Sequence, residues 1–237
     1  AAAAAAPPGA AAGRYDSSEV LYRCDHAFGP QSTQEQVYSK AVAPIAEAVI
    51  RGYNGAVIAY GQTGAGKTHT MVGAGTPGGD GVAPRAVAAI FAALEALEAE
   101  KPWMVAVTAL EIYNERARDL LSPTGAAAVE IHEHCAEEQR QSFRCPDATM
   151  WPARSPPEAL AALAEAARRR ETASTDMNHH SSRSHLVFTV CVWQGDPEDS
   201  SALHSRLHLV DLAGSERLKR TQGPGAGEST PGVPAAA

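Results

Sequence analysis

The chain has 237 residues, a formal net charge of −7 and 44% hydrophobic residues. This length allows one α/β domain with a buried core, and the acidic balance argues against binding nucleic acid through the whole surface. No apolar stretch is long enough to span a bilayer, and the Ala-rich start lacks the cationic and Leu-rich parts of a secretory signal. Four cysteines lie far apart without the spacing of metal ligands, which predicts free thiols in a reducing cytoplasm: Cys24, Cys135, Cys145 and Cys191.

The two ends of the sequence differ in composition from the middle. Residues 1–18 and 222–237 are dominated by Ala, Gly, Pro and Ser/Thr. They contain too few large apolar side chains to offset the entropy lost on ordering. We therefore predict that both ends are disordered and that residues 19–221 form the folded domain.

The first predicted helix begins at a capping box, Ser32-Thr-Gln-Glu35. Apolar residues then recur at every fourth position: Val37, Ala41, Ile45 and Val49. Pro44 lies inside this helix and is expected to kink or interrupt it, and Gly52 gives a stop. The short apolar run Ala56–Tyr60 then predicts a buried strand.

Helices and strands alternate through the rest of the sequence. A short helix is expected over Thr68–Val72, broken by the glycine-rich run Gly73–Gly81, and an amphipathic helix follows with its apolar stripe at Val87, Ile90, Phe91, Leu94 and Leu97. A later helix begins at Ser155-Pro-Pro-Glu158, with a predicted buried face of Leu160, Leu163, Ala164 and Ala167. Strands are predicted over Trp103–Tyr113, Val129–His134 (with Ile131 as its apolar anchor), His185–Trp193 and Leu203–Val210. This alternation indicates a layered α/β domain.

The most informative motif is Gly61-Gln-Thr-Gly-Ala-Gly-Lys-Thr68, which matches the pattern GxxxxGK[ST] in full. Its glycines let the backbone curl with N–H groups pointing inward, and a helix starting at Lys67 adds its positive end for an anion. Lys67 can reach the β- and γ-phosphates of a nucleotide, and the Thr68 hydroxyl can bind Mg²⁺. The preceding apolar strand and the following helix are the context that this motif needs. The sequence therefore predicts a phosphate loop of the ATP-binding kind.

Two further segments carry candidate site residues. Asp211 ends an apolar strand, where a phosphate-loop enzyme holds Mg²⁺ through water, and Gly214 can present its N–H to a γ-phosphate. In Asn178–His185, Ser181 and Ser182 are candidate ligands for Mg²⁺, the γ-phosphate or the attacking water. Arg183 is a planar cation that can pair with Glu216. Taken alone, the second segment also fits a polar loop before a strand.

These three segments, in this order, resemble the signature of the kinesin motor domain. Tyr53–Met71 resembles the family's phosphate-loop region almost letter for letter, Asn178–His185 (NHHSSRSH) resembles its switch I, and Asp211–Arg217 (DLAGSER) resembles its switch II. Leu110–Glu115 with Asp119–Leu121, and Phe28–Pro30 ahead of Gln34–Val37, are also typical. The resemblance runs from about Tyr22 to Thr221. It implies a phosphate-loop NTPase of the kinesin type, a three-layer α/β/α domain with a central mixed sheet, incomplete at both ends.

The resemblance also implies roles for individual residues. The phosphates of ATP would be cradled by Gly61, Gln62, Thr63, Gly64, Ala65, Gly66, Lys67 and Thr68, with His69 near the adenine. Mg²⁺ would be held by Thr68, Ser182 and Asp211. The catalytic group would be Ser181, Ser182, Arg183, Gly214 and Glu216: Ser181 would help to position the lytic water, Gly214 would sense the γ-phosphate, and Arg183 and Glu216 would form the ion pair that closes the switches. The implied partners are microtubules, and the implied location is the cytoplasmic cytoskeleton.

The sequence departs from the family at both ends. The Arg-x-Arg-Pro segment that packs on the adenine has no counterpart in Ala1–Gly13, and the match fades after Thr221. The main microtubule-binding surface is therefore expected to be missing, and Arg168-Arg-Arg170 and Lys219-Arg220 are the basic clusters that remain. The first of these is expected to cap the C-terminus of a helix.

Three functions fit the sequence. An ATP-hydrolysing microtubule motor, present as an incomplete head, fits every motif. A non-motile head that binds nucleotide, or nothing, and serves as a scaffold fits the missing elements. A small-molecule kinase fits the phosphate loop alone, since no acceptor site or Arg-rich lid is visible.

Overall fold

The computed structural model describes residues 23–74, 79–97, 102–135, 141–172, 183–196, 198–199 and 202–216. Contacts divide the chain into two units, residues 1–32 and 33–237. The described part of the first unit contains a turn in which the Ser32 N–H donates to the Gly29 carbonyl at 3.0 Å. The predicted disorder of residues 1–18 and 222–237 lies outside the described residues. No described helix is both long and apolar enough to cross a membrane.

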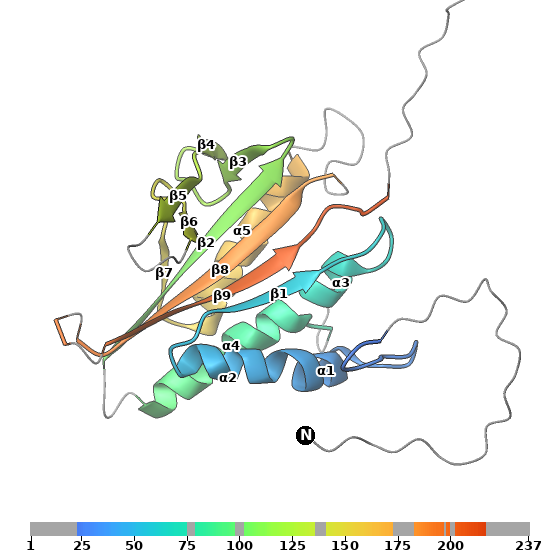
Figure 1. Cartoon of the computed structure of the whole chain (residues 1–237), viewed down its shortest axis with the longest axis horizontal. Coiled ribbons are helices and arrows are strands. Elements are labelled where there is room, and N and C mark those ends of the chain that lie inside the picture. The colour runs from blue at the N-terminus through green and yellow to red at the C-terminus, as the bar shows by residue number, and fades with distance from the viewer. Residues whose placement is uncertain are drawn as a thin grey trace, which may run out of the picture. The chain divides into compact units, whose positions relative to one another are not determined.

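A mixed sheet of seven strands organises the second unit (Figure 1). Its order is β1 (Gly55–Ala59), β9 (Leu203–Asp211), β8 (His185–Gln194), β2 (Trp103–Tyr113), β3 (Arg116–Asp119) and β4 (Ala127–Val129), with β7 (Trp151–Ala153) also paired to β2. β1 and β9 run parallel, and the other pairs are antiparallel. Because parallel neighbours end at the same edge, the ends of β1 and β9 bring the segment after Ala59 beside the segment after Asp211. A separate hairpin joins β5 (His132–Cys135) and β6 (Gln141–Arg144).

The first helix of this unit is interrupted as its proline predicts. It consists of α1 (Gln34–Val37), a π-helical turn η1 (Tyr38–Val42) and α2 (Ala43–Ile50). Pro44 lies in the first turn of α2, where it cannot donate to a carbonyl of the preceding turn, and the chain widens just before it. The capping box is Thr33 with Gln36, one residue later than predicted, because the Thr33 side chain accepts from the Gln36 N–H.

Three more helices complete the described fold: α3 (Lys67–Met71), α4 (Val82–Leu97) and α5 (Pro156–Thr172). The predicted stripe of α4 is buried except at Leu97. The predicted face of α5 is partly wrong, because Ala164 is exposed and the buried positions are Ala159, Ala162, Leu163 and Ala166. Alanines line this face because α5 packs closely against α4, β2 and β7.

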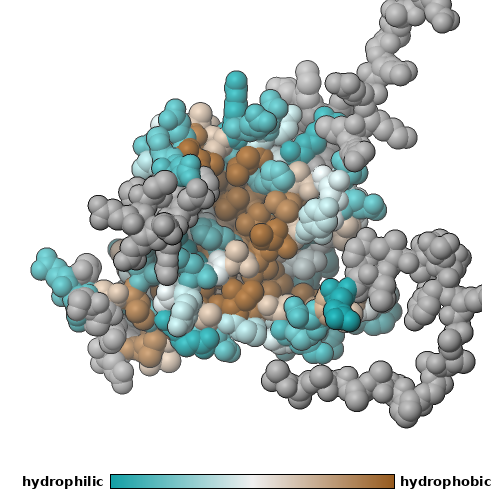
Figure 2. Space-filling view, in the orientation of Figure 1, coloured by the Kyte–Doolittle hydropathy of each residue, from teal (hydrophilic) through white to brown (hydrophobic). Residues whose placement is uncertain are grey.

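The described helices pack against one face of the sheet. Apolar side chains from α2, α4 and α5 share a single core with alternate residues of β2, β8 and β9, such as the row Leu209, Phe188 and Ala109. On the opposite face, a second row runs through Ile58, Val210, Val187 and Leu110, and Figure 2 shows an apolar area there. The second helical layer of the predicted three-layer domain is therefore not among the described residues.

Two strand predictions need correction. The run Ala56–Tyr60 was expected to be buried, but β1 lies at the edge of the described sheet and Ile58 is 59% exposed. Ile131 was expected to anchor a strand over Val129–His134, but that range is divided between β4 and β5, and Ile131 lies between them with its side chain exposed. Local apolar content is a poor guide here, because burial depends on what covers each face.

Candidate nucleotide-binding site

The glycine-rich loop between β1 and α3 has the conformation that its sequence requires. Gly64 and Gly66 have φ angles of 80° and 85°, in the left-handed region that residues other than glycine rarely adopt. α3 then begins at Lys67, as predicted, so the loop turns from a strand directly into a helix. This strand–loop–helix arrangement confirms the structural context expected for a phosphate loop.

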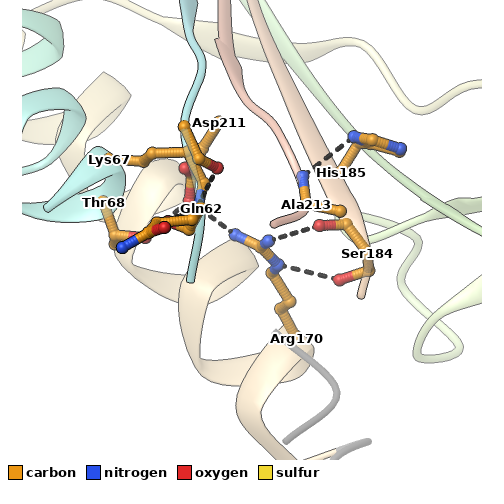
Figure 3. Close-up of polar contacts among 9 residues, drawn as sticks. Gln62, Lys67, Thr68, Arg170, Ser184, His185, Asp211 and Ala213 are labelled. Atoms are coloured by element: carbon orange, nitrogen blue, oxygen red, sulfur yellow. Dashed lines mark hydrogen bonds and ion pairs between the residues drawn. The ribbon is translucent and has the colours of Figure 1, made fainter. Parts of the chain in front are cut away.

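Lys67 lies back over this loop (Figure 3). Its ammonium group donates to the carbonyl of Gly61 at 3.0 Å and to that of Gln62 at 2.9 Å. An ammonium group has three donors, so these two contacts leave capacity for an anion and also hold the curl of the loop. Lys67 therefore lies against the loop that would receive phosphate, with one donor left for it.

Asp211, at the end of β9, forms the buried polar centre of the site. Its Oδ2 accepts from the Thr68 hydroxyl at 2.7 Å and from the Arg170 guanidinium at 3.0 Å. Asp211 is 1% exposed, and its Oδ1 is buried with no hydrogen-bond partner in the described structure. A buried carboxylate oxygen with an unused acceptor is costly unless a cation or water meets it. Thr68 and Asp211, both predicted as metal-site residues, are thus brought together.

Arg170 is a site residue that the sequence prediction missed. It was expected to cap the end of a helix, but only Arg168 and Arg169 lie toward the surface, where both pair with Glu165. Arg170 is 5% exposed, pairs with Asp211, and donates to the hydroxyl and carbonyl of Ser184 at 3.1 and 2.7 Å. Helical periodicity could have found it, since it follows Leu163, a residue of the predicted buried face, by seven residues.

The segment after Asp211 folds against the phosphate loop. The Ser215 N–H donates to the Gly61 carbonyl at 3.1 Å, and the Glu216 carboxylate accepts from the N–H of Thr63 at 2.9 Å and from its hydroxyl. The Thr63 hydroxyl and N–H are the leading causes that hold the pKa of Glu216 below its ordinary value. Gly214 is so close to the loop that an added Cβ would overlap Thr63 and Glu216. The predicted γ-phosphate sensor therefore lies beside the phosphate loop.

The remaining predicted residues are placed less completely. Ser181 and Ser182 lie outside the described residues. Arg183 is exposed, and its expected ion pair with Glu216 is not formed in the described structure, where Glu216 contacts Thr63 instead. The His69 side chain is exposed, and its backbone carbonyl accepts from the Gln34 amide at 2.7 Å. Just after Arg183, His185 begins β8, and its Nδ1 accepts from the Ala213 N–H at 2.9 Å (Figure 3).

Comparisons with known proteins agree on one family. A model of the kinesin motor domain matches residues 10–230. The kinesin heavy chain of Caenorhabditis elegans is 42% identical over 206 residues, which are 86% of this chain and 25% of that protein. The chromosome-associated kinesin KIF4 of Gallus gallus is 38% identical over 216 residues, which are 88% of this chain and 17% of that protein.

A solved structure gives the same answer. The structure described as that of a fast kinesin, with implications for its ATPase mechanism and its interactions with microtubules, superposes with a TM-score of 0.75 at 36% identity. The superposition covers 88% of this chain and 57% of that chain. The chain therefore spans a quarter or less of the two relatives' length and somewhat more than half of the solved chain.

Proposed function

The chain belongs to the kinesin motor domain family, and we propose that it binds and hydrolyses ATP as the nucleotide-binding part of a microtubule motor. The observation that carries this proposal is the convergence of two segments, the phosphate loop and the segment that begins at Asp211, on one edge of the sheet. The phosphate loop follows β1, Asp211 ends the parallel neighbour β9, and Gly214 lies against Thr63 of the loop. The chain spans only part of its relatives' length, so hydrolysis and movement by the whole protein are proposals.

The residues present fit a magnesium ion bound with the nucleotide. Thr68 contributes a hydroxyl, Asp211 has a buried oxygen without a partner, and both are hard oxygen donors of the kind that Mg²⁺ prefers. We assign these two residues to the ion, together with Ser182, which lies outside the described residues. When bound, Mg²⁺ would neutralise charge on the β- and γ-phosphates.

The protein's own groups supply the rest of the proposed chemistry. Lys67 would turn its ammonium group from the loop carbonyls toward the β- and γ-phosphates. The loop from Gly61 to Thr68 would receive the phosphates on backbone N–H groups, with His69 toward the adenine. Gly214 would donate its N–H to the γ-phosphate, where charge develops during transfer to water.

Positioning of the attacking water is proposed for Ser181 and Ser182, with Arg183 and Glu216 as the charged residues of the two switches. In the structure described here, Glu216 is held by Thr63 of the phosphate loop. A nucleotide bound in this loop would therefore lie next to the segment after Asp211, because the Glu216 carboxylate joins that segment to the loop. This link offers a physical route by which phosphate binding can be sensed at Glu216.

The test is nucleotide affinity in a pair of lysine variants. Lys67→Ala should weaken binding of a non-hydrolysable ATP analogue with Mg²⁺ by on the order of 10- to 100-fold, since a hydrogen-bonded charge is removed from the phosphates. Lys40→Ala is the matched control, because Lys40 is an exposed lysine of η1. Calorimetry would measure both. Equal affinity in Lys67→Ala and the original chain would contradict the site assignment.

A second measurement separates a motor from a non-motile scaffold. The whole protein should release phosphate from ATP faster when microtubules are added. Absence of that stimulation, with nucleotide binding intact, would contradict the motor and favour the scaffold.

A further inference from the structure

The segment Leu212–Ser215 is fastened by backbone donors to three different neighbours. The Leu212 N–H donates to the Ala59 carbonyl of β1 at 3.3 Å, and the Ser215 N–H donates to the Gly61 carbonyl at 3.1 Å. Between them, the Ala213 N–H donates to a side chain, the Nδ1 of His185, at 2.9 Å. Gly214 is the one residue of this segment whose N–H has no acceptor among the described residues. The arrangement leaves that N–H available for a ligand.

We propose that His185 is a positioning residue, which sets the orientation of the Ala213–Gly214 peptide and thereby aims the Gly214 N–H. This inference rests on the proposed function, because Gly214 matters only if a γ-phosphate binds beside it. The Gly214 N–H lies in the peptide plane between Ala213 and Gly214. That plane is joined to the Ala213 N–H through the Cα of Ala213, so fixing the Ala213 N–H restricts the rotation of the Gly214 N–H. The neighbouring bond from Ser215 restricts it from the other side.

His185 is itself held in place by the structure around it. It is the first residue of β8, and the residue before it, Ser184, is completely buried and bonded through its hydroxyl and carbonyl to Arg170. Arg170 also holds Asp211, two residues before Ala213. Figure 3 shows these contacts side by side: Arg170 reaches Asp211 and Ser184, and His185 reaches Ala213. The imidazole thus projects from a fixed strand end onto the segment that it positions.

The chemistry of the contact specifies which ring nitrogen carries the proton. The partner is a backbone N–H, which can only donate, so Nδ1 must present its lone pair and the ring proton lies on Nε2. The requirement at this site is therefore a rigidly placed acceptor two bonds beyond Cβ. Asn places its Oδ1 at the same number of bonds from Cα, whereas Gln places its oxygen one bond further.

This difference gives a matched pair of variants, His185→Asn and His185→Gln, which carry the same amide group at different reach. The binding assay compares affinity for the β,γ-imido analogue of ATP with affinity for ADP, both with Mg²⁺, using the full chain. In His185→Gln, affinity for the analogue should fall about fivefold or more, the equivalent of one hydrogen bond, and affinity for ADP should fall less than about twofold. His185→Asn should stay within about twofold of the original chain for both nucleotides.

A second readout does not depend on any nucleotide. Hydrogen exchange of a peptide covering residues 212–216 should be faster in His185→Gln than in the original chain, and His185→Asn should restore protection. Equal behaviour of the Asn and Gln variants, or equal losses for ADP and the analogue, would overturn the proposal. If the original chain bound neither nucleotide, the proposed function would fail, yet the exchange measurement would still decide whether His185 fixes Ala213.

Discussion

Arg170 offers the sharpest test of the site, because its guanidinium is buried against a buried carboxylate. The variant Arg170→Met keeps most of the apolar stem and removes the charge. Among the described residues, Asp211 would then retain the Thr68 hydroxyl at 2.7 Å as its one donor, and the hydroxyl and carbonyl of the fully buried Ser184 would lose the donors that Arg170 supplies. Removing one partner of a buried ion pair costs about 3–5 kcal/mol, because the other charge is left without compensation.

We expect a loss near the lower end, about 3 kcal/mol, since Thr68 still donates to Asp211 and methionine fills much of the vacated volume. If the free energy of unfolding falls by about 2 kcal/mol per molar urea, the urea midpoint of unfolding would fall by about 1.5 M. Circular dichroism at pH 7, without nucleotide, would measure this midpoint. The matched control is Arg168→Met, whose arginine pairs with Glu165 at the surface, and its urea midpoint should stay close to that of the original chain.

A double-mutant cycle isolates the pair itself. Asp211→Asn removes the charge that Arg170 balances, so the double variant Arg170→Met/Asp211→Asn should be more stable than the summed single effects imply, by about 2 kcal/mol. The reasoning is refuted if Arg170→Met is no more destabilised than Arg168→Met, or if the two substitutions simply add.

Two other predictions concern neighbouring residues. Gly214→Ala should lower affinity for an ATP analogue more than affinity for ADP, because the added Cβ would displace Thr63 and Glu216 beside the N–H that is proposed to meet the γ-phosphate. The calorimetric control is Gly29→Ala, where the added Cβ meets nothing within 4 Å. Equal losses of affinity for the two nucleotides in Gly214→Ala would contradict this placement of Gly214. Burial, with a smaller effect of Arg206, lowers the pKa of His208 below 6.5. Between the folded and unfolded pKa values the unfolded chain binds more protons, so stability should fall as pH drops below about 6.5. His208→Gln should make the urea midpoint less dependent on pH in this range, and an unchanged pH dependence would count against the lowered pKa of the partly buried His208.

The phosphate site could be predicted from the sequence because its residues are close together in the chain. The glycines of Gly61–Gly66, the lysine and the threonine form one local unit whose backbone conformation follows from residue type. Asp211 was also predictable, since a strand followed by a carboxylate is a local pattern. The comparisons confirm the family that these motifs indicated.

Arg170 and Thr63 are residues whose contacts the local sequence pattern did not predict. Three consecutive arginines look alike in the sequence, but only the third continues the buried face of α5 and meets Asp211 on another element. Glu216 was expected to pair with Arg183, yet its carboxylate lies against Thr63. Charge and residue type identified Glu216 as a site residue but not Arg170, and the partners of both depend on distances between segments far apart in the chain.

The sequence by itself determined the phosphate loop, the helix interrupted at Pro44 and the strands that carry Asp211 and His185, because each depends on backbone preferences and periodicity over a few residues. Only the tertiary structure decided which face of the sheet is covered, which arginine is buried and which nitrogen of His185 accepts a hydrogen bond. Burial and hydrogen-bond partners are properties of the whole packing arrangement. They therefore emerge only when β1, β8, β9 and α5 are brought together.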